Sequence, residues 1–457
     1  MITLFAHAGG LLGRADLPIP EWLFAWAAAM VLVVSFVALA VLWPEPRLER
    51  DRWRPLPGGR ALGSRPVEIL CGAIGVALLV AVIYTGLEGT QSPAANFAPT
   101  FVYVVFWIGL VPVSVLFGDV FRAFNPWRAI GRSVGWVAGR VVRSGLPAPL
   151  SYPERLGHWP AALGIFAFAV LELVRSGGDQ PDTVAVAALV YSALTFIAMA
   201  LYGVEAWSAR GEAYSVYFNL FSRISVFETR DGVVGVRPAL SGLARFAAGP
   251  GTAALLAVMI GSVTFDGAGE APLWTGIAPD LTNFFGDLGL SPQPAFELTF
   301  LVGLSGAILL VYAFYRLGIL GARSVGGGFG AGGLSLAFAP SLVPIALAYV
   351  MAHYFTYLLF RGQAIFFLAS DPLGDGSDLF GTAATQIDYG VIGASATWYW
   401  QVAFVVAGHV AALTLAHDRA LALYADAKLA VRSQYWMLAV MVGFTTLALW
   451  LLSQANT

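Results

Sequence analysis

The sequence predicts an all-α protein, a polytopic bundle of about ten transmembrane helices that forms a single integral membrane domain over residues 1–457. Three observations support this prediction. Hydrophobic residues make up 58% of the chain and charged residues only 11%, whereas about a quarter of a soluble domain is charged. Apolar runs of membrane-spanning length recur along the whole chain. Basic residues gather in alternate connections between these runs.

Ten apolar runs have spanning or near-spanning length, because about 20 apolar residues in a helix cross the hydrocarbon layer. They cover residues 22–43, 67–87, 100–118, 159–174, 183–204, 247–265, 296–316, 340–360, 396–416 and 433–453. The connections that we expect in the cytoplasm cover residues 44–66, 119–158, 205–246, 317–339 and 417–432.

The orientation follows from arginine and lysine, which are retained in cytoplasmic connections. Of the 25 basic residues, only Arg14, Arg175 and Arg361 fall on the other side. With ten helices, both termini then lie outside. We expect the N-terminal MITLFAHAGG to stay uncleaved, because no basic region precedes its short apolar stretch.

Two cytoplasmic connections resemble each other. GDVFRAFNPWRAIGR follows the third run and GEAYSVYFNLFSRIS follows the fifth. Both contain glycine and an acid, then Phe-Asn, an aromatic residue, arginine and isoleucine. Because both follow a run that enters the cytoplasm, they are candidates for a parallel internal repeat. The alternative is that each is an interfacial amphipathic helix with aromatic residues and arginine at the headgroup level.

The eighth and ninth runs carry the candidate functional site. One face of the eighth run carries Tyr349, His353, Tyr357 and Arg361 at four-residue spacing. The ninth run carries Gln401, His409 and His417 at eight-residue spacing, beside Gly408, Ala412 and Ala416. Small residues at such spacing let helices approach closely, and ionisable residues within a membrane usually face a bundle interior or a wet cavity.

We therefore predict His353 and His409 as catalytic residues. The predicted substrate-binding residues are Tyr349, Tyr357, Arg361 and Gln401. His417 and Asp418 are expected at the cytoplasmic end of the ninth helix, where charge needs no function. We expect no carboxylate in the middle of the membrane, and this disfavours a proton-coupled antiporter.

Metal and cofactor motifs are scarce in the sequence. It contains no HxH, HExxH or Cys-x-x-Cys pattern and no Gly-x-Ser-x-Gly elbow. The single cysteine, Cys71, excludes an intrachain disulfide. We assign no metal site and leave the cofactor unknown, with a haem or metal held by His353 and His409 as an open alternative. In the acidic loop 371–388, turns are favoured over a calcium site.

Several stretches resemble a family of actinobacterial multi-pass membrane proteins labelled fenitrothion hydrolase. They are FNPWRAI, HYFTYLLFRGQ, GHVAALTLAHDRAL and RSQYWMLAVMVGF, together with AHAGG and DLPIP near the N-terminus. The resemblance extends over most of the chain. It implies hydrolysis of an aryl organophosphorothioate ester, a hydrophobic substrate that partitions into membranes.

Two classes of function therefore remain open, with a membrane haem or metal protein as a third. The first is a hydrolase embedded in the cell membrane, with His353 or His409 as general base. The second is a transporter or permease with its polar site between the eighth and ninth helices. The expected partners are the lipid bilayer and a small hydrophobic molecule. We expect no nucleic-acid partner, because a basic patch that binds nucleic acid is not needed to explain the arginine-rich composition.

Overall fold

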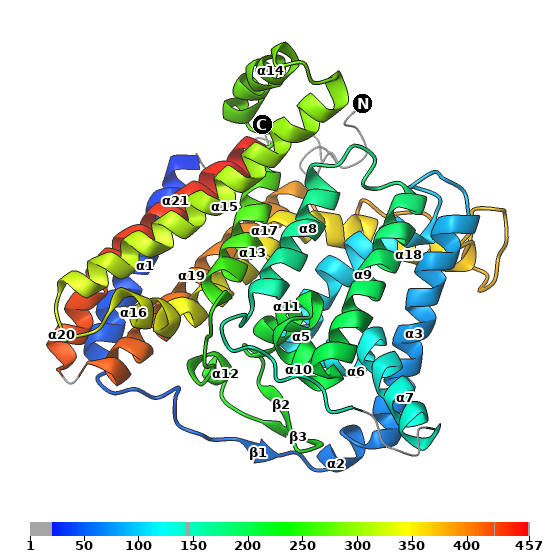
Figure 1. The fold of residues 1–457 in the computed structure, drawn as a ribbon. Helices are drawn as coiled ribbons and strands as arrows, with labels where there is room; N and C mark the ends of the chain where they lie inside the picture. Colours follow the sequence, from blue (N-terminus) through cyan, green and yellow to red (C-terminus); the bar gives the residue numbers. More distant parts are fainter. Residues whose placement is uncertain (1–20, 142–146, 425, 456–457) are drawn as a thin grey trace.

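The computed structural model describes residues 21–141, 147–424 and 426–455, and it is mostly helical (Figure 1). The N-terminal segment with His7 and Arg14, which we expect outside, lies beyond the described residues, as does Arg143.

The helices of the N-terminal half are α1 (Glu21–Leu42), α2 (Gly59–Leu62), α3 (Arg65–Glu88), α4 (Phe97–Thr100), η1 (Phe101–Gly109), α5 (Leu110–Phe117), α6 (Val120–Phe124), α7 (Pro126–Val141), α8 (Trp159–Leu173), α9 (Pro181–Tyr202), α10 (Val204–Arg210) and α11 (Ala213–Ser222). Those of the C-terminal half are α12 (Ser241–Ala244), α13 (Thr252–Ala268), α14 (Pro272–Asp287), α15 (Pro292–Ser324), α16 (Ala331–Phe338), η2 (Ala339–Leu342), α17 (Val343–Arg361), α18 (Ala364–Ser370), α19 (Ala394–Leu423), α20 (Ala427–Ser433) and α21 (Tyr435–Ala455). Strands β1 (Arg54–Pro55), β2 (Phe227–Arg230) and β3 (Val233–Val236) form one antiparallel sheet in the order β1-β3-β2.

Each of the ten apolar runs forms helix over most of its length. Helix is the expected outcome, because a backbone surrounded by lipid must satisfy its own hydrogen bonds within the segment. Within the described part of the chain, six helices are long and apolar enough to cross a membrane. The number is seven if α13 and α14, which meet at a bend of 91°, count as one broken span. The structure thus agrees with a membrane helix bundle.

Several connections that we expected as loops contain regular structure. Residues 119–158 include α6 and α7, and residues 205–246 include α10, α11, α12 and two strands. The expected outer loop 266–295 contains α14, whose exposed side chains include Leu273, Ile277 and Phe284. Hydropathy averaged over a window overlooks such helices, because their polar and apolar faces cancel. Figure 1 shows the sheet, α2 and α12 at one end of the bundle and α14 at the opposite end.

The span Phe97–Phe117 is irregular in its middle. Its central segment η1 is a π-helix of nine residues, a rare geometry that occurs most often at functional sites. Trp107 of η1 stacks on Tyr217 of α11 with ring centroids 4.4 Å apart. The Tyr103 hydroxyl donates a 2.7 Å hydrogen bond to the carbonyl of Gly178. The π-helix therefore lies in the buried centre of the bundle.

The two segments with similar sequences contact each other reciprocally. Asp119 caps α6, and Glu212, which is fully buried, caps α11. The Asn219 amide donates to Asp119 (2.7 Å), and the Asn125 amide donates to Glu212 (3.0 Å). Each acid thus caps its own helix and accepts a hydrogen bond from the asparagine of the other segment.

Candidate functional site

Helices α17 and α19 pack closely along each other, as the small residues of the ninth run predict. A β-carbon placed on Gly408 would lie 2.5 Å from the β-carbon of Ala348 and 2.6 Å from the carbonyl oxygen of Pro344. Ala412 and Ala416 are buried on the same helix. The absence of a side chain at Gly408 is therefore what lets the two backbones come this close.

The predicted site residues lie in this region, but the structure does not join them into one constellation. Tyr349, Tyr357, Gln401 and His409 are buried, while His353 and Arg361 are half-buried. Their hydrogen bonds mostly lead to other groups. Gln401 donates to the carbonyl of Ala352 (2.9 Å), His409 Nδ1 lies 2.7 Å from the Val405 carbonyl, and Tyr349 bonds to the Phe444 carbonyl (3.4 Å).

The two predicted catalytic histidines have separate environments. His353 Nε2 lies 3.0 Å from Oδ2 of Asp266 on α13. His409 Nδ1 instead hydrogen-bonds to the carbonyl of Val405 on its own helix. The ring of Tyr349 lies beside the imidazole, with the two ring centroids 6.5 Å apart. Arg361 and Tyr357 do bond to each other. The structure thus divides the predicted site into a His353 part and a His409 part.

Asp266 is the residue that sequence reasoning missed. We placed it in the outer loop 266–295, but α13 continues to Ala268, and Asp266 is buried with only 6% of its surface exposed. Its Oδ2 accepts a hydrogen bond from the Tyr354 hydroxyl (2.7 Å) as well as facing His353. Asp266 is thus a buried carboxylate two residues from the end of α13, and the expectation that no carboxylate lies in the middle of the membrane stays a prediction. Extending the sixth run by one helical turn would have included Asp266.

Further charge surrounds this pair. Glu172 on α8 is half-buried, and its charge acts on the hydroxyls of Tyr354 and Tyr357 together with that of Asp266. We call Glu172, Asp266, His353, Tyr354 and Tyr357 the Asp266 cluster. It is assembled from α8, α13 and α17, which lie side by side in Figure 1.

The chemistry of the Asp266 cluster is that of proton binding and transfer. A carboxylate that accepts a hydrogen bond from His353 Nε2–H holds the imidazole in one orientation and one tautomer. Tyr354 donates to the same carboxylate oxygen, so protonation of Asp266 would weaken two bonds that join α13 to α17. The pair can therefore act as a general base or as a proton relay.

A metal centre finds little support in the donors present. Over the ranges that the structure describes, no three histidine, cysteine, aspartate or glutamate side chains are arranged to hold a metal ion. In the acidic loop, the Asp371 carboxylate accepts hydrogen bonds from the backbone N–H groups of Asp375 and Gly376, each at 3.0 Å. Those carboxylate bonds build the turns that the sequence favours there.

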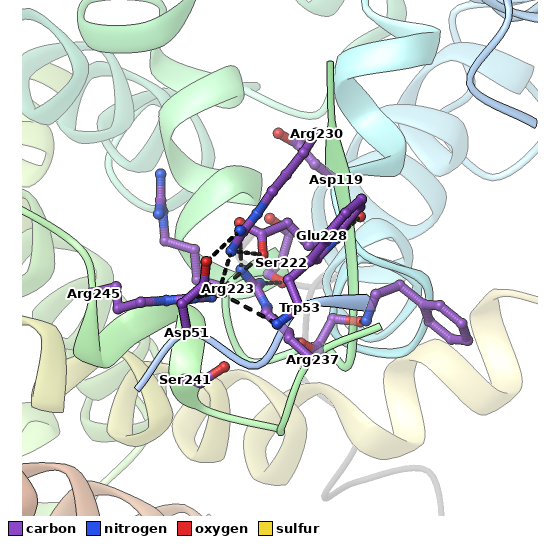
Figure 2. Close-up of polar contacts among 12 residues, drawn as sticks. Asp51, Trp53, Asp119, Ser222, Arg223, Glu228, Arg230, Arg237, Ser241 and Arg245 are labelled. Carbon is purple, nitrogen blue, oxygen red and sulfur yellow. Dashed lines mark hydrogen bonds and ion pairs between the residues drawn. The ribbon is translucent and has the colours of Figure 1, made fainter. Parts of the chain in front are cut away.

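At the end of the bundle near the sheet, arginines converge on two carboxylates (Figure 2). Glu228 pairs with Arg230 (2.9 Å), Arg237 (3.1 Å) and Arg245 (3.3 Å). Arg230 and Arg245 also pair with Asp51. Hydrogen bonding to Arg230 holds the pKa of Asp51 below its usual value, and burial lowers the pKa of Arg237. These contacts hold the segment after α1 against β2. Their partners are far apart in the sequence, so a local sequence pattern does not predict them.

His417 and Asp418 connect further helices near the C-terminal end of α19. Asp418 is fully buried and accepts hydrogen bonds from the Trp43 indole (2.9 Å) and from the backbone of Arg47 (2.6 Å). His417 lies between the Trp43 carbonyl (3.1 Å) and Oε1 of Gln434 (3.2 Å). The two side chains thus hold the end of α1 and the start of α21 against α19.

Comparison of the chain with protein-family models, with curated proteins and with solved structures gave no match.

Proposed function

We propose that this protein is a multi-pass cell-membrane transporter that couples the movement of a small hydrophobic solute to proton binding at the Asp266 cluster. The observation that carries the proposal is the contact between Asp266 and His353 inside the helix bundle. Ionisable pairs buried between membrane helices are expensive and mark proton or substrate pathways. Protonation of Asp266 would loosen its bonds to His353 and Tyr354, so proton binding would change how α13 packs on α17.

The features around the cluster agree with transport. The nearby span contains the π-helix η1, and the α13–α14 pair is bent by 91° directly after Asp266. Broken or irregular membrane helices are common beside the binding sites of transporters. The proposed site therefore differs from the one expected from sequence, since it lies between α13 and α17 instead of between α17 and α19.

The proposal includes ten spans with both termini outside. The position of basic residues supports the orientation, because arginine and lysine are retained on the cytoplasmic side. Arg230, Arg237 and Arg245 lie together at the end of the bundle that carries α2 and the sheet (Figures 1 and 2). Reporter fusions after residues 58, 92, 145, 280, 380 and 457 test it. Cytoplasmic reporter activity at 280 or 380 would contradict this topology.

We further propose that the two similar segments are equivalent parts of a parallel repeat. The reciprocal bonds of Asn125 to Glu212 and of Asn219 to Asp119 support this, because pairs exchanged in this way are what a local two-fold axis produces. A superposition in which the flanking helices do not correspond would argue against the repeat.

A second candidate function is hydrolysis of an aryl organophosphorothioate ester, the activity implied by the family resemblance. One observation favours it: a histidine oriented by a carboxylate is the arrangement of a general base. In this mechanism His353 takes a proton from the attacking water while Asp266 stabilises the imidazolium.

One probe separates the two functions. Purified protein is reconstituted into vesicles and given a radiolabelled aryl phosphorothioate ester under an inward proton gradient. Transport predicts accumulation of intact ester, which Asp266→Asn reduces by roughly tenfold or more. The matched control is Asp280→Asn, since Asp280 is exposed on α14. Release of the phenol without accumulation supports hydrolysis, and accumulation that ignores the proton gradient contradicts proton coupling.

A further inference from the structure

One face of α19 carries a file of buried polar atoms that the protein itself does not satisfy. Among the described side chains, Thr397 Oγ1, Gln401 Oε1 and His409 Nε2 are buried and have no hydrogen-bond partner. The exposed fractions of these residues are 4%, 6% and 0%. Steps of four and eight residues turn about 40° and 80° around an α-helix, so the three residues lie within about one third of its circumference.

This face is turned toward α17. The Gln401 amide donates to the carbonyl of Ala352 on α17, so the other end of the same amide lies at the α17–α19 interface. Gly408, next to His409 in the chain, lies close against Ala348 and Pro344. Because Nδ1 of His409 bonds to the Val405 carbonyl, that nitrogen carries the proton, and Nε2 is left as an acceptor.

A buried polar atom without a partner destabilises the fold by about 1–3 kcal/mol. Each of the three atoms is therefore expected to have a partner, and one kind of partner can serve all of them. Water is the ligand that suits them, because it can donate to oxygen and nitrogen acceptors that are buried in the protein.

We propose that internal water molecules lie along the α17–α19 interface and form a proton path between the Asp266 cluster and the inner end of α19. Gln401 bonds to the carbonyl of Ala352, the residue before His353, and so marks the outer end of the path. The buried pair His417 and Asp418 marks the inner end. Gln401, His409 and His417 follow at steps of eight residues, each about 12 Å along the helix and about 80° around it. The path therefore leaves the α17–α19 interface after His409 and turns around α19 toward Trp43 and Gln434, which His417 contacts. About three or four waters can bridge each step.

The transfer step conserves atoms and charge. A hydronium at one side of His409 gives its proton to Nε2, and the imidazolium returns a proton from Nε2 to a water on the other side. The other ring proton stays on Nδ1, hydrogen-bonded to the Val405 carbonyl, throughout. His409 is therefore a relay that begins and ends in the same state.

The presence of the waters is tested by radiolytic hydroxyl labelling of the full-length protein in vesicles, read by mass spectrometry. Bound internal water should label Tyr349 and His409 although both are buried. In His409→Leu the labelling of Tyr349 should fall several-fold. In the control Thr414→Val it should not change, because the Thr414 hydroxyl is already bonded to the Val410 carbonyl. Absence of labelling at both residues in the wild type overturns the proposal.

The proton role rests on the proposed function and is tested separately. With the phosphorothioate probe, His409→Leu should lower proton-driven uptake by roughly tenfold while exchange of solute without a gradient continues, and His409→Gln should restore part of the loss. Unchanged proton-driven uptake in a labelled, folded His409→Leu overturns the path but leaves the transporter. No proton-driven uptake in the wild type overturns the proton role together with the proposed function, and the labelling still decides whether the water file exists.

Discussion

Replacing Gly408 by alanine tests whether α17 and α19 pack as closely as the structure indicates. The new β-carbon would lie 2.5 Å from that of Ala348 and 2.6 Å from the carbonyl oxygen of Pro344. Carbon atoms in contact prefer a separation of about 3.5 Å or more, so the helices must move apart by about 1 Å. Such overpacking lowers the free energy of unfolding by about 1–3 kcal/mol.

The control is Gly306→Ala on α15, where a β-carbon would meet nothing within 4 Å. Alanine is the better helix former by about 1 kcal/mol, so this variant should be as stable as the wild type or slightly more stable. Thermal unfolding of both variants in detergent measures the difference. If Gly408→Ala melts no lower than Gly306→Ala, the close approach of α17 and α19 is wrong, and with it the interface on which the water file depends.

Two further predictions concern buried groups that lie outside the ten apolar runs. Glu212→Gln should lower the free energy of unfolding by roughly 2–4 kcal/mol, because its amide NH₂ would face donors from Tyr191, Ser215 or Asn125. The control is Glu154→Gln, since Glu154 is exposed. Equal melting temperatures of the two variants would contradict the capping role of Glu212. Burial, with smaller effects from Arg223 and Arg210, lowers the pKa of His158 to about 4. The folded state therefore binds fewer protons than the unfolded state. Its free energy of unfolding falls as the pH drops from about 6.5 toward 4. Between pH 7.5 and 5 this loss is about 2 kcal/mol. Chemical denaturation of His158→Gln at both pH values should show a correspondingly smaller loss. A pH dependence equal to that of the wild type would refute the lowered pKa of His158.

The sequence by itself determined where the long apolar helices form. All ten apolar runs are helical, because the need to satisfy backbone hydrogen bonds within an apolar segment is a local property. Its small residues also predicted the close approach of α19 to α17, which the structure shows at Gly408, and helical periodicity places Ala412 and Ala416, both buried, on the same face. The burial of Gln401 and His409 follows from the same periodicity.

Only the tertiary structure decided which polar groups meet. His353 and His409 are both buried or half-buried, yet one binds Asp266 and the other its own helix. The residue that sequence reasoning left in a loop, Asp266, is the centre of the candidate site because α13 extends one turn further and packs against α17. Likewise, Glu212 and Asn125 are 87 positions apart, and nothing in their local sequence states that they bond.

The physical reason is a difference in range. Hydropathy and helical spacing report on interactions within about one or two turns of a helix. Partner choice among buried polar groups depends instead on how whole helices are rotated and shifted against one another, which is set by many packing contacts between distant segments. A shift of one turn moves a carboxylate by about 5 Å, and that distance separates an expected outer loop from the buried partner of His353.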